Sequence, residues 1–285
     1  MRDKILKLLE KRGDIPPLPE VMIRLEAKIE DPDVDIEEIA LIIETEPVLA
    51  GRLLQLSNSV FFGGGRDPVE DLAGAILRLG LKMVLDLTFT LELPNLFKKV
   101  RIPNQRHFWQ HSLAVAVFSR VFSQRFLEIK CEPDLCYISG LMHDIGIMVF
   151  SYLLPNEYSA FLRNNWSSKT PGHVLEEKEF GINHAELGAL FIKKWWALRP
   201  EVAEAVRYHH SDLTGDKKVS TVTKVVYIAN YVANNFGFQN KVLNKADHLF
   251  DDKNLLGYGI NLEVLEEIVA EIKAELESTS EILYK

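Results

Sequence analysis

The sequence predicts an all-α protein, and two features of the chain support that fold class. Apolar residues recur every three or four positions through most of its 285 residues, the spacing that lines one face of a helix. No convincing series of segments alternates apolar and polar residues in the way a half-buried strand does. Hydrophobic residues make up 47% of the chain, which is enough for a sizeable core. We therefore expect helices packed against helices.

Capping residues mark the predicted helices in the first hundred residues. Asp35, with Glu38 three residues later, forms an acidic capping box at the start of one helix. Pro47 suits the first position of the next helix. Gly80 suits the C-terminal cap of a third. The helices predicted in this part of the chain span residues 35–46, 47–58, about 69–80 and 81–94.

The second half of the chain continues the helical pattern. Residues 108–126 are apolar along one wide face, so this helix should be central and buried. The other helices predicted here span residues 133–154, 184–198, 200–210 and 221–236. A polar, less regular stretch follows at about 237–258, and then an amphipathic helix over 261–276. Its inner stripe is predicted to be Leu262, Leu265, Ile268, Val269 and Ile272.

Two prolines and a cluster of charges near residue 100 mark a predicted boundary. The stretch reads ELPNLFKKVRIPNQ, and no internal repeat or low-complexity tract suggests another division. We expect two helical lobes, residues 1–100 and residues 101–285. The second lobe carries most of the histidines.

Charge and cysteine content limit the partners and the compartment. The formal net charge is −8, which argues against a surface for nucleic acid or for an anionic membrane. The longest apolar runs are shorter than the roughly 20 residues that span a bilayer. Cys131 and Cys136 are too few for a secreted disulfide framework, so we expect free thiols. These observations predict a soluble, cytoplasmic protein without nucleic-acid or membrane partners.

Polar residues interrupt the apolar helices of the second lobe at a few positions. His143 and Asp144 are adjacent within the apolar segment SGLMHDIGIMVF, where polar groups are costly unless something satisfies them. His111 lies four residues after His107, on the same helical face. His184 opens a later helix.

A pair of histidines, His209 and His210, ends another predicted helix. Each histidine taken singly is best explained as a surface residue or a hydrogen-bonded core residue, and we assign that role to His173 and His248. Several imidazoles and one carboxylate on converging helices instead favour a metal or polar site. Such ligands suit a borderline metal such as Fe, Mn, Zn, Co or Ni.

The order of these histidines resembles the HD-domain superfamily of metal-dependent phosphohydrolases. It is most similar to the branch with an extra histidine pair, which hydrolyses cyclic dinucleotides. The N-terminal residues resemble the HDOD family, the HD-related output domain of bacterial signalling proteins. The resemblance covers roughly residues 14–215 and rests on the stretches IPPLPEVMIRLEAKIEDPDVDIEEIALIIETEPVLAGRLLQLSNSVFFG and AILRLGLKMVLDL.

The resemblance implies that the C-terminal lobe is an HD-domain-like helical bundle with a metal site. By position, the implied ligands are His111, His143, Asp144, His184, His209 and His210. His107 is a weaker additional candidate. The sequence departs from the pattern at three places. Asn230 stands where a final Asp ligand is expected, Ile147 stands where the dinuclear branch has Lys, and no Gly-Tyr-Pro loop follows His210.

The charge of the implied site favours one metal ion over two. Two divalent ions with neutral histidines and only Asp144 would leave about +3 in a largely apolar lobe, which is unfavourable. One ion leaves about +1, which a hydroxide or a bound phosphate would neutralise. Arg207, one turn before His210, is a candidate to hold an anion near the metal.

Two functions remain open from the sequence. The first is a bacterial signal-transduction output module of the HDOD type with a degenerate metal site, which binds a signalling protein partner or a small phosphorylated ligand. The alternative is an active metal-dependent phosphohydrolase or phosphodiesterase, acting on a cyclic nucleotide or dinucleotide, in which the metal activates water. The incomplete ligand set favours the first function.

Overall fold

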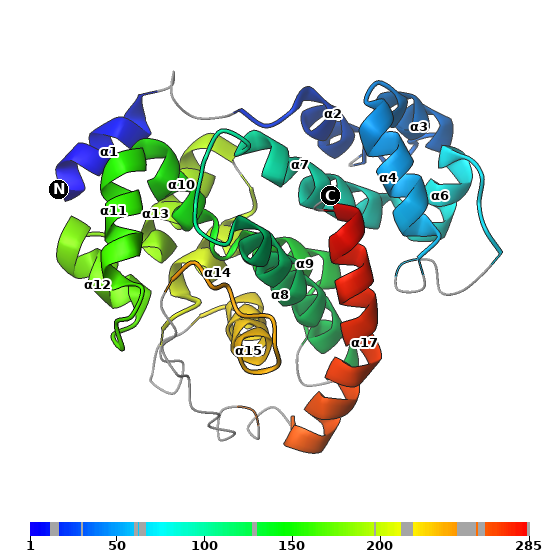
Figure 1. Ribbon diagram of the computed structural model, residues 1–285. Helices are drawn as coiled ribbons and strands as arrows, with labels where there is room; N and C mark the ends of the chain where they lie inside the picture. Colours follow the sequence, from blue (N-terminus) through cyan, green and yellow to red (C-terminus); the bar gives the residue numbers. More distant parts are fainter. Residues whose placement is uncertain are drawn as a thin grey trace. The chain divides into compact units, whose positions relative to one another are not determined.

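The computed structural model describes residues 1–11, 17–29, 31–59, 62, 67–126, 130–196, 198–211, 219–243, 255 and 260–283. All regular secondary structure within these residues is helical, which confirms the predicted fold class. The helices labelled in Figure 1 are α1 (Arg2–Glu10), α2 (Glu20–Ile29), α3 (Ile36–Glu44), α4 (Pro47–Ser57), α6 (Leu72–Leu79), α7 (Leu81–Leu96), α8 (Gln105–Arg125), α9 (Pro133–Met142), α10 (Ile145–Leu153), α11 (Pro155–Asn165), α12 (Gly172–Phe180), α13 (His184–Phe191), α14 (Pro200–Tyr208), α15 (Thr221–Asn235) and α17 (Leu262–Leu283). A short π-helical segment, Ile192–Trp196, continues α13.

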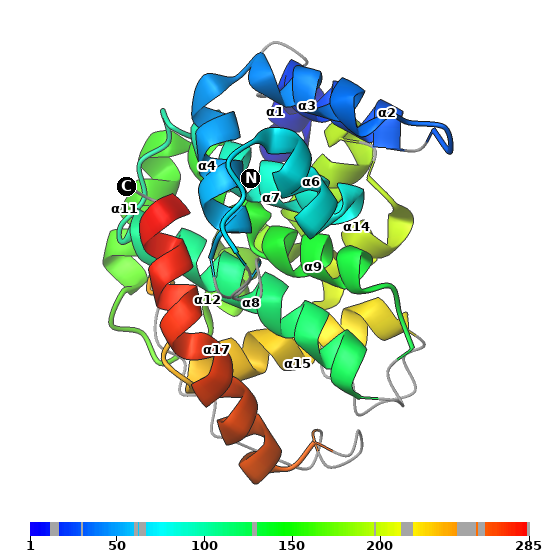
Figure 2. The same ribbon diagram turned by 90° about the vertical axis from the view of Figure 1, so that its right-hand side faces the viewer.

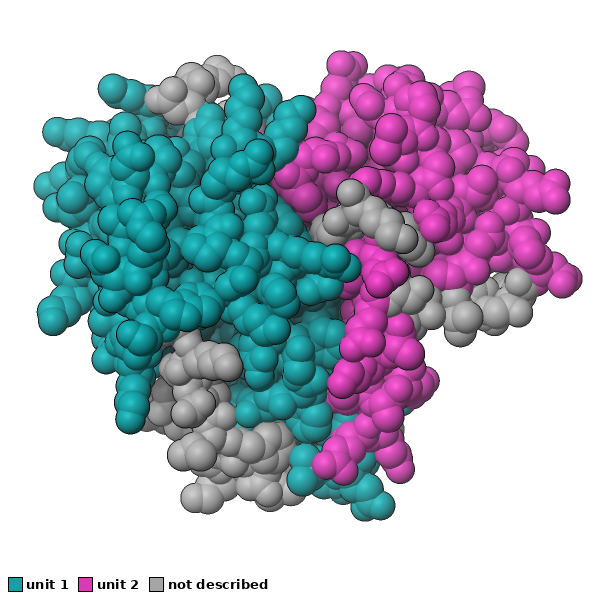
Figure 3. Space-filling view, in the orientation of Figure 1, with its two compact units in different colours: residues 1–17, 97–265 teal, residues 18–96, 266–285 magenta. Residues whose placement is uncertain are grey.

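The chain divides into two compact units, coloured separately in Figure 3. Unit 1 comprises Met1–Pro17 and Phe97–Leu265, and unit 2 comprises Leu18–Leu96 and Glu266–Lys285. The division at Phe97 lies close to the predicted boundary at residue 100, but both chain ends are grouped differently from the predicted lobes. Helix α1 belongs to unit 1 because its residues bond to distant ones. The Arg2 guanidinium binds the Glu186 carboxylate at 2.8 Å, and the Trp195 indole donates to the Leu9 carbonyl at 2.9 Å.

In unit 2, several helices start or end where the capping residues predict. Asp35 caps α3 by accepting a hydrogen bond from the Glu37 amide, and Pro47 opens α4. The predicted reciprocal partner, Glu38, instead binds the Lys28 ammonium at 2.6 Å. Helix α6 begins at Leu72, three residues later than predicted, because the Asp71 side chain caps it through the Gly74 amide. Gly80 ends α6 at a φ of 78°.

Helix α7 continues past Pro94, where the sequence predicts its end. It reaches Leu96, so Pro94 lies in its last turn. A proline there removes one backbone donor near the end of the helix, where the disruption affects few further hydrogen bonds. Leu91 and Leu93 are fully buried, and this packing stabilises the turn that contains the proline.

Helix α8 is the central element of unit 1, as its wide apolar face predicts. Most of its residues are buried, and α9 and α15 pack against it in both views (Figures 1 and 2). Gly140 allows α9 to approach α8 closely, because a Cβ at this position would lie 2.8 Å from the Val115 carbonyl oxygen. Helix α13 packs against both α10 and α14.

The apolar stretch predicted as one helix over 133–154 is two helices. Helix α9 ends at Met142 and α10 begins at Ile145, so His143 and Asp144 lie at the break. The stretch Pro133–Leu153 is apolar enough to cross a membrane, but 89% of its most apolar window is buried inside the structure, as in a core helix of a soluble protein. Its apolar pattern continues across the break, which is why periodicity does not reveal it.

The predicted inner stripe of the last helix is largely confirmed. Leu265, Ile268, Val269 and Ile272 are buried, whereas Leu262, the first residue of α17, is 44% exposed. Leu262 is exposed because it lies at the end of the helix, where fewer neighbouring side chains pack against it. The two cysteines are free thiols, as expected.

Two glycines in unit 2 give a matched test of backbone conformation. A Cβ at Gly80 or at Gly51 would meet no atom within 4 Å, but only Gly80 has a positive φ. We expect Gly80→Ala to lower the free energy of unfolding by about 1–3 kcal/mol, because L-residues avoid this region. Gly51→Ala, inside α4, should raise it by about 1 kcal/mol. Urea unfolding followed by circular dichroism measures both, and equal effects of the two substitutions would contradict the conformational explanation.

Candidate metal centre

Helix ends bring five of the six predicted ligands together, and the sixth comes from the middle of α8. His111 projects from α8, His143 follows α9, and Asp144 precedes α10. His184 is the first residue of α13, and the pair at 209–210 directly follows α14. A side chain at a helix end can point along the helix axis into a space where other helices also end.

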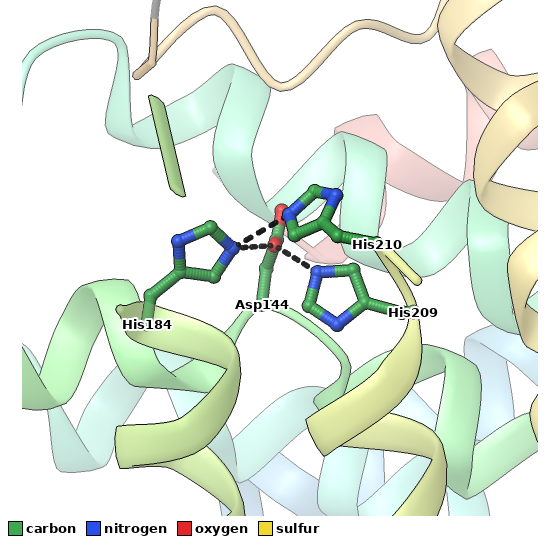
Figure 4. Close-up of side chains that lie close together, drawn as sticks. All are labelled: Asp144, His184, His209 and His210. Carbon is green, nitrogen blue, oxygen red and sulfur yellow. Dashed lines mark hydrogen bonds and ion pairs between the residues drawn. The ribbon is translucent and has the colours of Figure 1, made fainter. Parts of the chain in front are cut away.

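The carboxylate of Asp144 lies at the centre of the cluster. Its Oδ2 is 3.2 Å from the His143 Nε2 and 3.7 Å from the His111 Nε2. Figure 4 shows the other side, where the Nε2 atoms of two imidazoles turn toward Asp144. His184 and His209 each place Nε2 3.3 Å from Oδ1. Asp144 therefore has one oxygen facing each half of the cluster.

Backbone carbonyls orient three of the imidazoles from behind. The Nδ1 atoms of His111, His143 and His209 lie 2.6–2.7 Å from carbonyl oxygens, those of Phe238, Gly140 and Val206 respectively. A carbonyl only accepts, so each Nδ1 carries a proton, and each ring turns its Nε2 into the cluster. This arrangement is typical of histidines that bind metals.

A carboxylate, that of Glu176 on α12, orients the fourth imidazole. Its Oε2 accepts from the backbone amide of His184 at 2.8 Å and from Nδ1 at 2.6 Å. Its Oε1 accepts from the Tyr158 hydroxyl at 2.5 Å. All three side chains are fully buried. Glu176 is not evident from the sequence because it lies in the charged run EEKE, which is typical of a solvated face. One signal was available: Glu176 is spaced by four residues from Gly172 and from Phe180, which are both buried.

The described residues fit a divalent metal ion. The Nε2 atoms of His111 and His143 face each other 3.2 Å apart, close enough to bind the same cation. The Nε2 of His209 is buried without a well-directed hydrogen bond. Two ligand groups share Asp144, and the ligand atoms of each lie within 4.8 Å of one another. We call them group 1 (His111, His143 and Asp144) and group 2 (Asp144, His184, His209 and His210).

Burial and neighbouring charges shift the pKa values of the cluster in opposite directions. Burial lowers the pKa of His111 and that of His209 to about 4, so both rings are neutral at physiological pH. Burial also opposes the charging of His184, but the Glu176 and Asp144 carboxylates outweigh it and raise its pKa to about 10. The Nε2 of His184 lies 2.9 Å from the His210 Nε2 and 3.3 Å from the Asp144 Oδ1.

The remaining candidates lie outside both ligand groups. His107 is half-buried on α8, one turn before the cluster. The Asn230 side chain accepts a hydrogen bond from the Asn234 side chain at 2.8 Å, on its own helix. The amide of Asn240, in the segment after α15, is the one that donates to Asp144 Oδ2. Arg207 binds the Glu186 carboxylate at 3.3 Å.

Of the two histidines assigned ordinary roles, one lies against the cluster. The ring of His173, the second residue of α12, stacks on His210 with ring centroids 4.2 Å apart and planes 15° apart. His173 and His210 are partly exposed, whereas the histidines of group 1 are buried. No spacing rule in the sequence links these two rings, because α12 and α14 are separated by another helix. His248 lies outside the described residues.

Gly146 sets the distance between Asp144 and His184. A Cβ at Gly146 would lie 1.9 Å from the His184 carbonyl oxygen and 2.9 Å from the Gly188 amide. Any side chain here would push α10 and α13 apart. The small residue therefore keeps the beginnings of the two helices, and the ligands located there, within reach of each other.

Comparisons with known proteins agree with this architecture. The HDOD domain family matches residues 15–212. An uncharacterised protein of Treponema pallidum is 25% identical over 223 residues, which are 78% of this chain but only 43% of that protein. The chain thus spans less than half the length of this curated relative.

Solved structures share the fold at low identity. An HDOD domain protein of unknown function from Geobacter sulfurreducens has a TM-score of 0.82 and 23% identity, covering 99% of this chain and 97% of its own. A protein of Marinobacter aquaeolei, provisionally named for signal transduction, has a TM-score of 0.77 and 19% identity over 100% and 66% of the two chains. A protein of Shewanella amazonensis, provisionally named a phosphohydrolase, has a TM-score of 0.76 and 20% identity over 98% of each chain.

We expect Gly146→Ala to disrupt the cluster. Forcing α10 away from α13 should lower the free energy of unfolding by about 1–3 kcal/mol and weaken metal binding. The measurements are urea unfolding and the metal content after dialysis against zinc. Gly51→Ala, which meets no atom and lies in unit 2, is the control for metal content. A Gly146→Ala protein with unchanged metal content would show that the close helix approach does not position the ligands.

Proposed function

The chain belongs to the HDOD domain family, and we propose that it is a metal-binding output module of bacterial signal transduction. In this proposal, the cluster around Asp144 holds a transition metal ion, which contributes to binding a small phosphorylated ligand or a signalling protein partner. Fe, Mn, Zn, Co and Ni are the metals that the imidazole-rich ligands suit. The ion would supply a Lewis acid for phosphate oxygens.

One observation carries this proposal: the cluster has the ligands for a metal but lacks two groups that hydrolysis would use. Ile147 is fully buried one turn from the doublet, at the position where the resemblance implies Lys. Arg207, the candidate anion-binding residue, is paired with Glu186. Neither position therefore supplies a cation to stabilise charge on a transferred phosphoryl group.

The exposed edge of the cluster favours a ligand-binding role. His173 and His210 are partly exposed and stacked, whereas the other histidines of the two groups are buried. A ligand that reaches the metal would approach past these two rings. A phosphate suits this approach because its negative charge offsets the charge of the ion.

The alternative function is a metal-dependent phosphohydrolase or phosphodiesterase, with a cyclic nucleotide or dinucleotide as substrate. The observation that favours it is the presence of two ligand groups that share Asp144, an arrangement able to hold two ions.

Composition supports the proposed partners and compartment. The net charge of −8 is unsuited to nucleic-acid or membrane partners, and the free thiols suit the cytoplasm.

The metal content of the purified protein tests the proposed metal binding. Protein purified without added metal should contain about one equivalent of a transition metal, because several imidazole nitrogens converge on the buried Asp144 carboxylate. Elemental analysis by mass spectrometry measures this, with Asp144→Ala, which removes the carboxylate that both ligand groups share, as the variant expected to bind less. Less than about a tenth of an equivalent in the wild-type protein, with none taken up on incubation with the five metals, would contradict the proposal.

Phosphodiester hydrolysis distinguishes the output module from the hydrolase. With Mn, Fe, Zn, Co and Ni supplied in turn, the protein should hydrolyse bis(p-nitrophenyl) phosphate and cyclic di-GMP no faster than His143→Ala does. Inorganic phosphate should still bind the metal-loaded protein in calorimetry and not the metal-free protein. Hydrolysis that His143→Ala abolishes would establish the alternative function instead.

A further inference from the structure

We propose that the metal ion is held most tightly by group 2, with Glu176 behind it as a second buried carboxylate. This inference rests on the metal binding of the proposed function and adds which ligand group is filled first. The doublet His143–Asp144 taken alone would point to group 1, because both of its residues belong to group 1 and only Asp144 belongs to group 2.

Charge compensation is the first argument for group 2. Glu176 is fully buried, and its two oxygens accept three hydrogen bonds, from the His184 amide, the His184 imidazole and the Tyr158 hydroxyl. An arrangement with donors only is typical of an ionised carboxylate. A divalent ion in group 2 would therefore lie near two negative charges, those of Asp144 and Glu176, and the local charge would sum to zero. Buried charge is tolerated when it is compensated in this way.

Group 1 has no comparable compensation among the described residues. Its two imidazoles are backed by neutral carbonyls, those of Phe238 and Gly140. The Asp144 oxygen on this side, Oδ2, already accepts a hydrogen bond from the Asn240 amide. The candidate fourth ligand, Asn230, has its side-chain oxygen bonded to Asn234. Group 1 thus offers three ligand residues, and one of its ligand atoms, Asp144 Oδ2, already accepts a hydrogen bond from Asn240.

Glu176 also orients a ligand of group 2. Its bonds to both N–H groups of His184 define the ring's tautomer and direct its Nε2 toward Asp144 and His210. The Tyr158 hydroxyl holds the second carboxylate oxygen, and the Tyr158 ring stacks on Phe150 with planes 5° apart. Glu176 is therefore a positioning residue, supported by packing, rather than a ligand.

The test compares one ligand from each group. Wild-type protein, His111→Ala and His210→Ala are loaded with Co²⁺, and affinity is measured by competition with a chromophoric chelator. The visible absorption of Co²⁺ reports the ligands directly. His210→Ala should weaken binding by about 100-fold and change the spectrum, since it removes a ligand of the tight position. His111→Ala should weaken binding less than about threefold and leave the spectrum unchanged.

A second comparison tests the carboxylate. Glu176→Gln should weaken Co²⁺ binding by about 10- to 100-fold, because it removes the buried charge and alters the hydrogen bond to His184. Glu179→Gln is the matched control, the same change at an exposed position of the same helix, and should have no effect. Circular dichroism in the presence of chelator checks folding. If His210→Ala does not fold, the comparison of Glu176→Gln with Glu179→Gln still tests whether the ion lies in group 2.

The outcomes distinguish this inference from the function on which it rests. Loss of the ion from His111→Ala with retention by His210→Ala would overturn the assignment to group 2, while leaving metal binding intact. Wild-type affinity in Glu176→Gln would overturn the role of the carboxylate. Absence of any bound ion in the wild-type protein would instead refute the proposed function itself.

Discussion

The buried carboxylate of Asp144 is the constraint around which unit 1 is organised. It is 4% exposed, in a core otherwise built from apolar helices, and a bare charge there would be strongly unfavourable. The neighbouring imidazoles, together with hydrogen bonds from the cluster, outweigh burial and hold the pKa of Asp144 well below its usual range. The break between α9 and α10, the starts and ends of α13 and α14, and the segment that carries Asn240 all bring groups to this one side chain.

Close helix packing makes that convergence possible. Gly140 lets α9 lie against α8, and Gly146 lets α10 lie against the start of α13. These contacts bring together the helices that carry the cluster residues. The site is therefore part of the core and not a feature of surface loops, so the stability of unit 1 and the geometry of the cluster depend on the same interactions.

The cluster is suited to hold a cation. Its Nε2 atoms lie around the Asp144 carboxylate, and the buried Glu176 carboxylate lies behind the His184 ring. Part of the free energy of metal binding would then go into stabilising unit 1. Binding of an ion, or of an anion to it, would then change the stability of this helical unit.

Local signals in the sequence determined much of the fold and most members of the buried histidine–aspartate cluster. Periodicity and caps such as Pro47 and Gly80 predicted the helices, because these signals act within one or two turns. The spacing of histidines, read with a family resemblance, named residues that the structure brings together. Only the tertiary structure decided the helix break at Asp144, the grouping of α1 and the partners Glu176 and Asn240. Those contacts join residues far apart in the sequence, and helix packing, which no local pattern encodes, sets which of them meet.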